Sequence, residues 1–577
     1  MRTVEDRVFF HRSEYPWVTM NKGRLLTLRV DVKGRITDLK VIYGDPFNFF
    51  PGTKIPELEI RSMNPVQIIG DITRYQITLH VKTRKLRYHF EAELEEHYKI
   101  YILESGTFSD AEEIEIRPFY ISYIYDEELS KAFFSKNNDV YYQVFTDRFC
   151  NPKRADYESF VPTSENHFGG TFDGLISKLD YIKDLGCTGI YLNPILKSNS
   201  NHGYDVLDYT SVSENFGGKE AFSRLTQEIH SRNMKVMLDG VFNHCGWEHP
   251  FWQDVLEKKN QSKYKDWFMI YDFSRLKSRN KSDYPPELFK TDPPFEVFAF
   301  ASNMPKWNTR NPEVIDYLTG TAVRLTHEFQ IDSWRLDVPD EISRSFLKVF
   351  RDRMKEQNSE IYIIGEIWQK NDRWVSDRLF DGTMDYPLYY AVRDFAMTGM
   401  DDLKTFFERV KEIILSETEE VYRNNFGFCS NHDIPRAFYV CSEDEKRFEV
   451  SYLLIAFLSG NLSVYYGDEI SMDGGNDPDC RRPMNWNMVS PERIGFMKAL
   501  IRMKLEISGS DLDYLEYRNG KMQIVRKDHN KHYYLVLETA EKETVELSPE
   551  HMIISMPYEQ SFLQAEFRIV EQPEKSI

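Results

Sequence analysis

The chain has 577 residues and carries 73 basic against 92 acidic side chains, which gives a net charge of −19. This length is enough for one large domain together with several smaller ones. A field this negative repels the phosphates of nucleic acids and of anionic membrane surfaces, so we expect neither as a partner and expect a neutral ligand instead.

The beginning of the chain and its cysteines bear on the compartment. The first residues, "MRTVEDRVFFHRSEY", contain no apolar run of signal-peptide length, and no later segment offers about 18 uninterrupted apolar residues. The six cysteines are scattered, without a CxxC pair or a metal-ligand spacing. We therefore expect a soluble, cytoplasmic protein with reduced thiols.

The first 125 residues alternate in the manner of β-strands. Apolar side chains occupy every second position over residues 26–32 and again over residues 86–92. This alternation predicts an N-terminal β-sandwich over residues 1–125, with a domain boundary near residue 126.

From residue 126 the chain alternates apolar strands with longer helical segments. Leu179, Ile182 and Leu185 fall at helical spacing before Gly186, and the apolar strand "TGIYLNP" follows. We recognise eight strands, "YYQVF", "TGIYLNP", "KVMLDG", "DSWRLD", "IYIIGEIW", "DGTMDYPL", "FGFCSNHD" and "LSVYYGDE". Because parallel strands need crossover helices, this pattern predicts an α/β protein with a (β/α)₈ TIM barrel over residues 126–507.

Two further regions complete the predicted organisation. Residues 245–310, after the third barrel strand, are rich in Pro, Lys and aromatic residues and lack clean periodicity, which predicts an inserted domain. Alternation returns in "HYYLVLE" and predicts a C-terminal β-sandwich domain over residues 508–577.

Polar residues gather where the predicted barrel strands end, which is where a barrel places reactive groups. They are Asp239, Asn243 and His244 after the third strand, Arg335 and Asp337 at the fourth, Glu366 at the fifth, and Asn431, His432 and Asp433 at the seventh. A single acid at such a position is a solvated loop charge about half of the time or more. Acids beside His, Asn and Arg at several strand ends indicate a reaction site.

Two of these carboxyl groups suit the two roles in glycosidic bond cleavage, which needs one ionised and one protonated group. Arg335 and Asp337 are two residues apart on a strand, so their side chains point to the same face and the guanidinium would hold Asp337 ionised. A structural buried ion pair is the alternative. Glu366 has Trp368 nearby and no adjacent base, so apolar surroundings would raise its pKa and keep it protonated.

Four short motifs carry a resemblance to a known family. "DGVFNH", "WRLDVPDE", "GEIW" and "SNHD", in this order, resemble the four motifs of the α-amylase superfamily, glycoside hydrolase family 13. The resemblance implies that Asp337 is the nucleophile, Glu366 the acid and base, and Asp433 a stabiliser of the transition state. We place among the substrate-binding candidates Asp239, Asn243, His244, Arg335, Trp368 and His432.

The motif "HGYD" resembles a substrate-binding motif of the same family. By this resemblance Tyr204 would stack on the sugar being cleaved, and His202 and Asp205 would help to hold it. Core packing of Tyr204 is the alternative.

Three other segments resemble one subfamily. "MPKWN" is close to the "MPKLN" typical of neopullulanase, cyclomaltodextrinase and maltogenic amylase, and "VIYGDPF" resembles their extra β module. "YYGDEISMDGGNDPDCRRPM" resembles their segment after the eighth strand and adds Arg482 to the substrate-binding candidates. The resemblance implies cleavage of α-1,4 and some α-1,6 bonds in cyclodextrins, maltooligosaccharides, pullulan or glycogen-derived glucans. It also implies a homodimer in which the β module of one chain covers the site of the other.

The resemblance implies a reaction that retains the anomeric configuration. Attack by Asp337 would give a covalent glycosyl-enzyme, which water activated by Glu366 would release. A sugar hydroxyl in place of water would give transglycosylation. Glu341 matches a family position near the acceptor side and would affect this partition, with a simple salt bridge as the alternative.

The chain departs from the family pattern at several positions. Ser333 stands in place of Gly, Pro339-Asp340 in place of Ala-Asn, and Gln369 in place of His. The family's "GGD" is replaced by a segment ending in Thr171, which removes a carboxylate ligand for a hard cation. We therefore expect no tightly bound calcium and no other cofactor.

Two other classes of function stay open at this point. An α-1,6-glucosidase or α-amylase of the same superfamily would be favoured by another sequence in place of "MPKWN". A glycan-binding or partner subunit without catalysis would be expected to have lost Asp337, Glu366 or Asp433, and all three are present. A lectin-like role for residues 1–125 is a further alternative.

Overall fold

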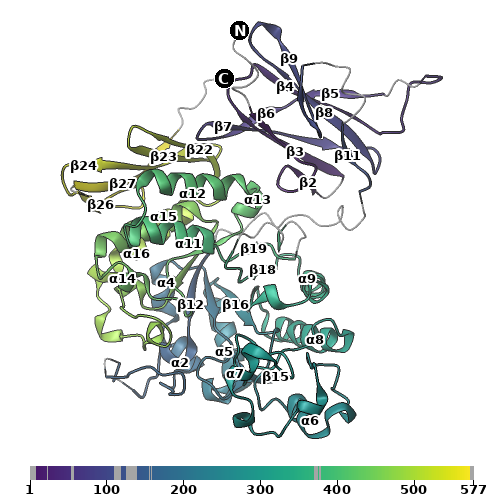
Figure 1. The fold of residues 1–577 in the computed structure, drawn as a ribbon. Helices are drawn as coiled ribbons and strands as arrows, with labels where there is room; N and C mark the ends of the chain where they lie inside the picture. Colours follow the sequence, from purple (N-terminus) through teal and green to yellow (C-terminus); the bar gives the residue numbers. More distant parts are fainter. Residues whose placement is uncertain are drawn as a thin grey trace.

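The computed structural model places a β module at one end of the molecule and a helix-covered barrel at the other (Figure 1). The predicted boundary near residue 126 lies outside the residues that the structure describes, so it stays a prediction. The described residues are 8–21, 24–53, 57–109, 118–124, 139–154, 156–157, 159–369, 374–375, 379–559 and 561–571.

The barrel is an eight-stranded parallel sheet whose strands follow one another in chain order. An isolated parallel bridge between Met384 and Phe426 links the two ends of this sheet and so closes it. All eight predicted strands are present, and the predicted (β/α)₈ barrel is confirmed. The strands are β12 (Val140–Val144), β13 (Gly189–Leu192), β16 (Lys235–Gly240), β17 (Ser333–Leu336), β18 (Tyr362–Gly365), β19 (Gly382–Thr383), β20 (Phe426–Phe428) and β21 (Asn461–Tyr465).

Amphipathic helices cover the outside of the barrel because each has one apolar face to bury. On α5, Phe222, Leu225 and Ile229 are completely buried, as their helical spacing predicts. On α8, the side chain of Asn311 caps the first turn by accepting from the N–H of Glu313 at 2.9 Å. The helices are α4 (Leu179–Leu185), α5 (Gly218–Ser231), α8 (Pro312–Phe329), α9 (Arg344–Gln357), α11 (Tyr386–Val392), α12 (Leu403–Leu415), α15 (Glu445–Leu458) and α16 (Pro491–Glu506).

The N-terminal module is a sandwich of two sheets, as predicted. Its core contains the alternating apolar residues of 26–32 and 86–92. One sheet contains β4 (Asp38–Gly44), β5 (Glu59–Ser62), β8 (Leu86–Glu93), β9 (Lys99–Leu103), β10 (Gly106–Phe108) and β11 (Phe119–Ile121). The other contains β1 (Val8–Phe10), β2 (Val18–Asn21), β3 (Leu25–Lys33), β6 (Asn64–Ile69) and β7 (Ile72–His80).

This second sheet continues into the C-terminal region, which the alternation pattern had predicted as a separate β-sandwich domain. Strand β6 pairs in parallel with β22, with Ile68 opposite Tyr514 and Ile69 opposite Leu515. The two β regions therefore share one eleven-stranded sheet. The C-terminal strands are β22 (Asp511–Arg518), β23 (Lys521–Lys527), β24 (Lys531–Ala540), β25 (Val545–Leu547), β26 (His551–Tyr558) and β27 (Ser561–Glu571).

A buried arginine of the N-terminal module joins the module to the barrel through hydrogen bonds. Arg74 binds both carboxylate oxygens of Asp31, at 2.7 and 2.9 Å. The same guanidinium donates to the backbone carbonyls of Leu415 and Glu417, just after α12, at 2.9 and 3.1 Å. Because the guanidinium is only 3% exposed, these bonds are shielded from water and salt.

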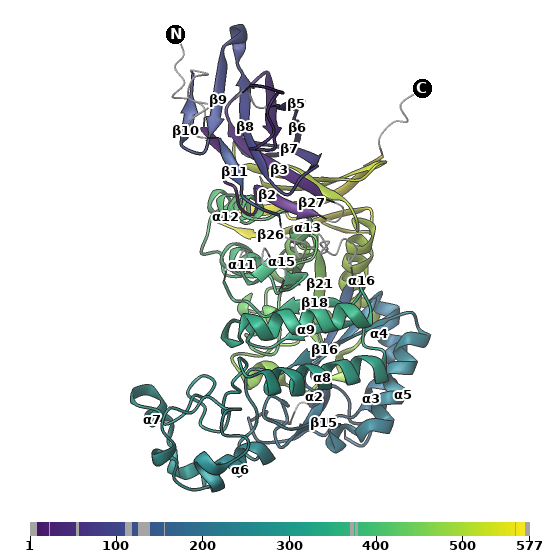
Figure 2. The same ribbon diagram turned by 90° about the vertical axis from the view of Figure 1, so that its right-hand side faces the viewer.

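The insertion of residues 245–310 carries α6 (Pro250–Lys258) and α7 (Pro286–Thr291) and lies at the end of the molecule away from the β module (Figure 2). Its core is aromatic, with Trp252, Phe268, Phe295 and Trp307 in contact. In the part of the chain that the structure describes, no helix is both long and apolar enough to cross a membrane.

Candidate active site

A cavity of about 510 Å³ opens at the carboxyl ends of the barrel strands. Asp337 follows β17, Glu366 follows β18 and Asp433 follows β20, so three strands bring three carboxyl groups to one place. The predicted residues that also line the cavity are His202, Tyr204, His244, Glu341 and Trp368. The structure therefore brings together most of the predicted site.

Arg335 lies at the centre of these carboxyl groups and is completely buried. Its Nη1 atom is 2.8 Å from Asp239 and 2.9 Å from Asp337, and its Nη2 atom is 2.8 Å from Glu366 and 3.9 Å from Asp433. Asp239 and Arg335 are register partners on β16 and β17, which explains their contact. The expectation that Glu366 has no adjacent base is thus wrong, since the guanidinium reaches across to the next strand.

Burial sets the protonation of the two central carboxyl groups. It raises the pKa of Glu366 to about 7, with Arg335 opposing and Asp433 adding to the shift. It raises the pKa of Asp337 well above the usual value, because Arg335 does not outweigh burial and the charges of Glu366 and Asp239. Arg335 favours the ionised form of Asp337, as expected, but its effect on the pKa is limited because one cation is shared among several acids.

Asp433 differs from the other two. Burial opposes its charged form, yet His432, Arg481 and Arg335 together lower its pKa below the usual value. Arg481 lies 3.3 Å from Asp433 and His432 lies 3.2 Å from it. Asp433 is thus the carboxylate of this group that is ionised most easily.

Aromatic side chains border Glu366. The indole N–H of Trp368 donates to Oε1 of Glu366 at 3.1 Å. The Trp368 ring stacks on Tyr386, with centroids 4.4 Å apart, and stays 43% exposed. A flat face that is both supported from behind and open to solvent suits stacking on a sugar ring.

Tyr204 is held among polar partners and is not packed as an ordinary core residue. Its hydroxyl donates to Asp239 at 2.8 Å and contacts Nε2 of His432 at 2.5 Å. Its ring is parallel to that of His432, with 3° between the planes. His202 accepts from the Tyr204 N–H through Nδ1 at 3.0 Å, and these two residues of "HGYD" both line the cavity.

His244 of the third-strand motif lines the cavity next to Tyr204. His244 contacts the carbonyl of Tyr204 at 3.1 Å and stacks on Phe298. Asn243 donates to Glu341 at 3.1 Å and does not line the cavity itself. Glu341 also pairs with Lys306 at 3.1 Å, so it forms a salt bridge and borders the cavity at once.

Two predicted residues lie elsewhere. Asp205 accepts from Ser200, and Arg482 pairs with Asp479 at 2.8 Å and with Asp473 at 3.1 Å; neither lines the cavity. The neighbouring Arg481 contacts Asp433 instead. No sequence spacing distinguishes the two arginines, because they stand at the end of a short 3₁₀ helix with no regular face.

Sequence reasoning also missed Phe298, which lines the cavity from the insertion. The insertion lacks the periodicity that would assign its side chains to a face, so no signal in the sequence identified it.

The departures from the family motifs have local explanations. The hydroxyl of Ser333 forms a 2.8 Å hydrogen bond with that of Tyr141 inside the barrel, where both side chains are completely buried. Val338 has a left-handed backbone with φ of 43°, and Pro339 begins the 3₁₀ helix that follows it. Gln369 is exposed.

The family's calcium position is occupied by a helix cap. Thr171 accepts from the N–H of Gly174 at 3.1 Å and begins α3 (Phe172–Ile176). A hydroxyl used in this way is a poor replacement for a carboxylate ligand. Among the described residues, no group of three or more His, Cys, Asp or Glu side chains could hold a metal ion.

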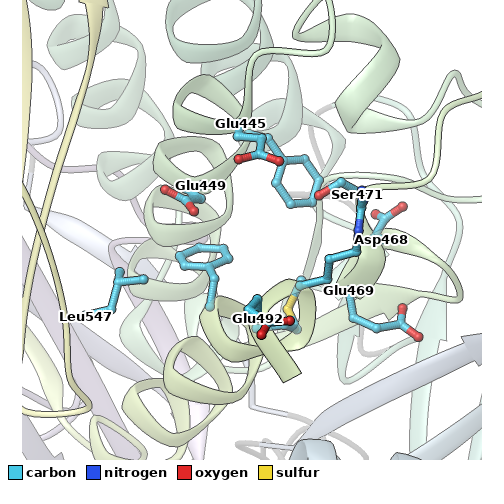
Figure 3. Close-up of a pocket in the computed structure, with 11 residues that line it drawn as sticks. Glu445, Glu449, Asp468, Glu469, Ser471, Glu492 and Leu547 are labelled. Atoms are coloured by element: carbon cyan, nitrogen blue, oxygen red, sulfur yellow. The ribbon is translucent and has the colours of Figure 1, made fainter. Parts of the chain in front are cut away.

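A second cavity, of about 270 Å³, lies between α15 and α16 (Figure 3). Glu445, Glu449 and Glu492 surround its opening (Figure 3). The buried Glu469 behind them already accepts from Tyr142 at 2.6 Å and from Tyr181 at 2.8 Å. Arg493 also lines this cavity, but its guanidinium donates to the carbonyl of Ile470 at 3.2 Å, whereas Arg335 in the barrel site pairs with several acids.

The chain was compared with known proteins. Residues 143–537 match the family described as "Alpha amylase, catalytic domain", and residues 7–125 match "Alpha amylase, N-terminal ig-like domain". A cyclomaltodextrinase of Geobacillus thermopakistaniensis is 33% identical over 554 residues, which cover 94% of this chain and 90% of that protein. Neopullulanase 2 of Thermoactinomyces vulgaris is 32% identical, covering 89% and 87%.

A solved structure of a cyclomaltodextrinase superimposes with a TM-score of 0.80 at 26% identity, covering 97% of this chain and 99% of that one. The family match spans more than half of the chain, and the relatives match it over nearly their whole length. Together with the barrel and its paired carboxyl groups, these matches show that the chain belongs to the alpha-amylase family of glycoside hydrolases.

Proposed function

We propose that this protein cleaves α-1,4 and some α-1,6 glucosidic bonds in cyclodextrins, maltooligosaccharides and pullulan, with retention of configuration. The observation that carries the proposal is the pair of carboxyl groups, Asp337 and Glu366, bound to the two ends of one buried guanidinium. These substrates are supported by two relatives that match nearly the whole chain and are named cyclomaltodextrinase and neopullulanase.

Two displacements at the anomeric carbon would make up the reaction. The protonated Glu366 gives its proton to the leaving oxygen while ionised Asp337 attacks and forms a glycosyl ester. Glu366, now ionised, takes a proton from water as the water oxygen attacks the anomeric carbon; the bond from that carbon to Asp337 breaks, and both side chains return to their starting states. The pKa of Glu366 near 7 suits both roles, since a group is an efficient acid and base near its own pKa.

Asp433 would bind hydroxyl groups of the sugar at the bond being broken, and the buried His432 lies next to its carboxylate. Asp433 is the most readily ionised acid of the group, and a carboxylate accepts hydroxyl protons in charge-assisted bonds. Tyr204 would stack beneath the same ring, supported by the parallel ring of His432.

The acceptor side of the cavity would control transfer to a second sugar. Trp368 offers a half-exposed aromatic face beside Glu366, and Glu341 borders the same cavity. A sugar stacked on Trp368 would bring a hydroxyl to the glycosyl ester in competition with water, and so give transglycosylation.

We further propose a cytoplasmic homodimer without bound calcium. Phe47, Phe49 and Phe50 in the N-terminal module are 71%, 40% and 47% exposed, which suits a surface covered by a second copy. Cys150, Cys187, Cys245, Cys429, Cys441 and Cys480 are unpaired, as expected for a reducing compartment.

Product analysis on β-cyclodextrin, pullulan and maltotriose tests the proposed reaction. Wild type should release smaller sugars from at least one of them, and Asp337→Asn should lower kcat by at least about 10³-fold. Asp332→Asn, at the other end of the same strand, is the matched control and should keep its activity. The proposal fails if wild type releases nothing from any of them or if Asp337→Asn is fully active.

A further inference from the structure

Gln143 lies on the first barrel strand, β12, and is 1% exposed. It was not among the predicted site residues. We propose that Gln143 is a positioning residue, which fixes the tautomer of His432 and thereby the orientation of Asp433. The inference rests on the proposed function, because the orientation of Asp433 matters to a sugar in this cavity.

The protons of the neighbouring groups can be assigned one by one, beginning with Tyr204. Its hydroxyl lies 2.8 Å from Oδ2 of Asp239. The same oxygen accepts from the hydroxyl of Tyr191 at 2.8 Å, and Oδ1 of Asp239 accepts from Arg335 at 2.8 Å. An acid with three donors around it acts as an acceptor, so the single proton of Tyr204 points to Asp239. In its 2.5 Å contact with His432, Tyr204 must therefore accept, and Nε2 of His432 carries the proton.

The other ring nitrogen leads to the same tautomer independently. Burial lowers the pKa of His432 to about 3, so the ring is neutral and only one of its two nitrogens carries a proton. The side-chain amide nitrogen of Gln143 lies 3.0 Å from Nδ1 of His432 and 3.3 Å from Oδ1 of Asn193. The amide has two protons for these two acceptors.

Asn193 completes the network. Its own amide donates to the hydroxyl of Tyr204 at 3.1 Å, so that hydroxyl accepts from Asn193 and His432 while it donates to Asp239. In the opposite tautomer, with the proton on Nδ1 of His432, the N–H of Gln143 and the N–H of His432 would face each other without an acceptor. The unprotonated Nε2 would then face the carboxylate of Asp433.

The tautomer matters because of what lies beyond the ring. Nε2 of His432 is 3.2 Å from Oδ2 of Asp433, so a proton on Nε2, which is directed to the hydroxyl of Tyr204, also brings a positive partial charge next to that carboxylate. The ring is completely buried and stacks parallel to Tyr204, which prevents it from turning to another partner. Among the described residues, Gln143 is the side chain that donates to Nδ1, and loss of this donor would release the constraint on Asp433.

Gln143→Met removes the amide while nearly keeping its length. We expect kcat on maltotriose to fall on the order of tenfold, the factor for one buried hydrogen bond, with little change in KM. His432→Gln should also lower kcat, and adding Gln143→Met to it should cause no further loss. Gln67→Met is the control, since Gln67 is also buried and donates two hydrogen bonds but lies away from the barrel cavity; it should lower Tm and keep kcat.

Nitrogen-15 NMR of histidine-labelled wild type reads the tautomer directly, with the His432 signals assigned from His432→Gln. We expect the Nε2-protonated form; a proton on Nδ1 overturns the proposal whether or not Gln143→Met folds. Unchanged kcat in Gln143→Met, or losses that multiply in the double variant, overturn it too. If wild type cleaves no α-glucan, the proposed function fails, and the NMR result still decides the tautomer.

Discussion

The Nη2 atom of Arg335 lies 2.8 Å from the Oε2 atom of Glu366. The other terminal nitrogen of the same guanidinium lies 2.9 Å from Asp337. One cation thus bridges the two carboxyl groups proposed to break the bond. Because burial raises the pKa of both, the pair is expected to keep one proton in common until the substrate draws it to Glu366.

The first prediction concerns the alkaline limb of activity. Glu366 must be protonated to act as the acid, and its pKa is about 7, so kcat/KM should fall as the pH rises above about 7. Glu366→Gln should lower kcat by at least about 10²-fold, and its remaining activity should no longer fall as the pH rises above about 7. A pH profile on maltotriose checks this, and wild-type activity that stays level up to about pH 9 would contradict it.

The second prediction concerns stability at the same residue. The folded-state pKa of Glu366, about 7, lies above the ordinary value of 4.5, so the folded protein binds the proton more tightly. The resulting stabilisation is complete below about pH 4.5 and is lost as the pH rises through 7.

Glu366→Gln, which stays neutral, should therefore raise Tm relative to wild type at about pH 8, by roughly 2 °C or more, and by less at about pH 5. Thermal unfolding of both proteins at the two pH values measures this difference. An equal Tm difference at both pH values would show that the Glu366 proton is not linked to folding.

The third prediction tests the hydroxyl pair inside the barrel. Ser333→Ala leaves the hydroxyl of Tyr141 buried without its 2.8 Å partner, which should lower the free energy of unfolding by about 1–3 kcal/mol. Adding Tyr141→Phe removes the orphaned group and should restore part of the loss. Denaturant unfolding of the two single variants and the double variant checks this, and strictly additive losses would refute the coupling.

The fourth prediction tests the buried ion pair of the β module, whose Arg74 also donates to the barrel. Arg74→Leu leaves Asp31 as a buried charge without its partner, which should cost about 3–5 kcal/mol of unfolding free energy. Arg61→Leu is the matched control, because Arg61 is 61% exposed and should change stability by less than about 0.5 kcal/mol. Calorimetry measures the unfolding free energy of both variants, and an equal loss in the two would contradict the prediction.

Periodicity sufficed to predict the barrel. Each strand is an apolar run, and the helices between them follow the spacing of residues such as Phe222, Leu225 and Ile229. Even β19, two residues long, could be placed, because the barrel needed a strand there. Strand ends then indicated where Asp337, Glu366 and Asp433 would meet.

Contacts across the structure could not be predicted in the same way. The reach of Arg335 to Glu366 depends on the register of β17 against β18, which places Trp334 beside Ile363 and cannot be read from either strand alone. The choice of Arg481 over Arg482 depends on a loop without a regular face. The pairing of Ile68 with Tyr514 joins residues far apart in the chain, and no local sequence pattern predicts it.

The pairing of β6 with β22 has a consequence for shortened forms of the protein. A chain that lacks residues 1–138 would expose the backbone N–H and C=O groups of β22 that now face β6, together with the carbonyl of Leu515 that accepts from Gly70. An uncovered strand of this kind recruits strands of other molecules. The module thus protects the C-terminal sheet from self-association, and removing it would cost solubility as well as any role in binding.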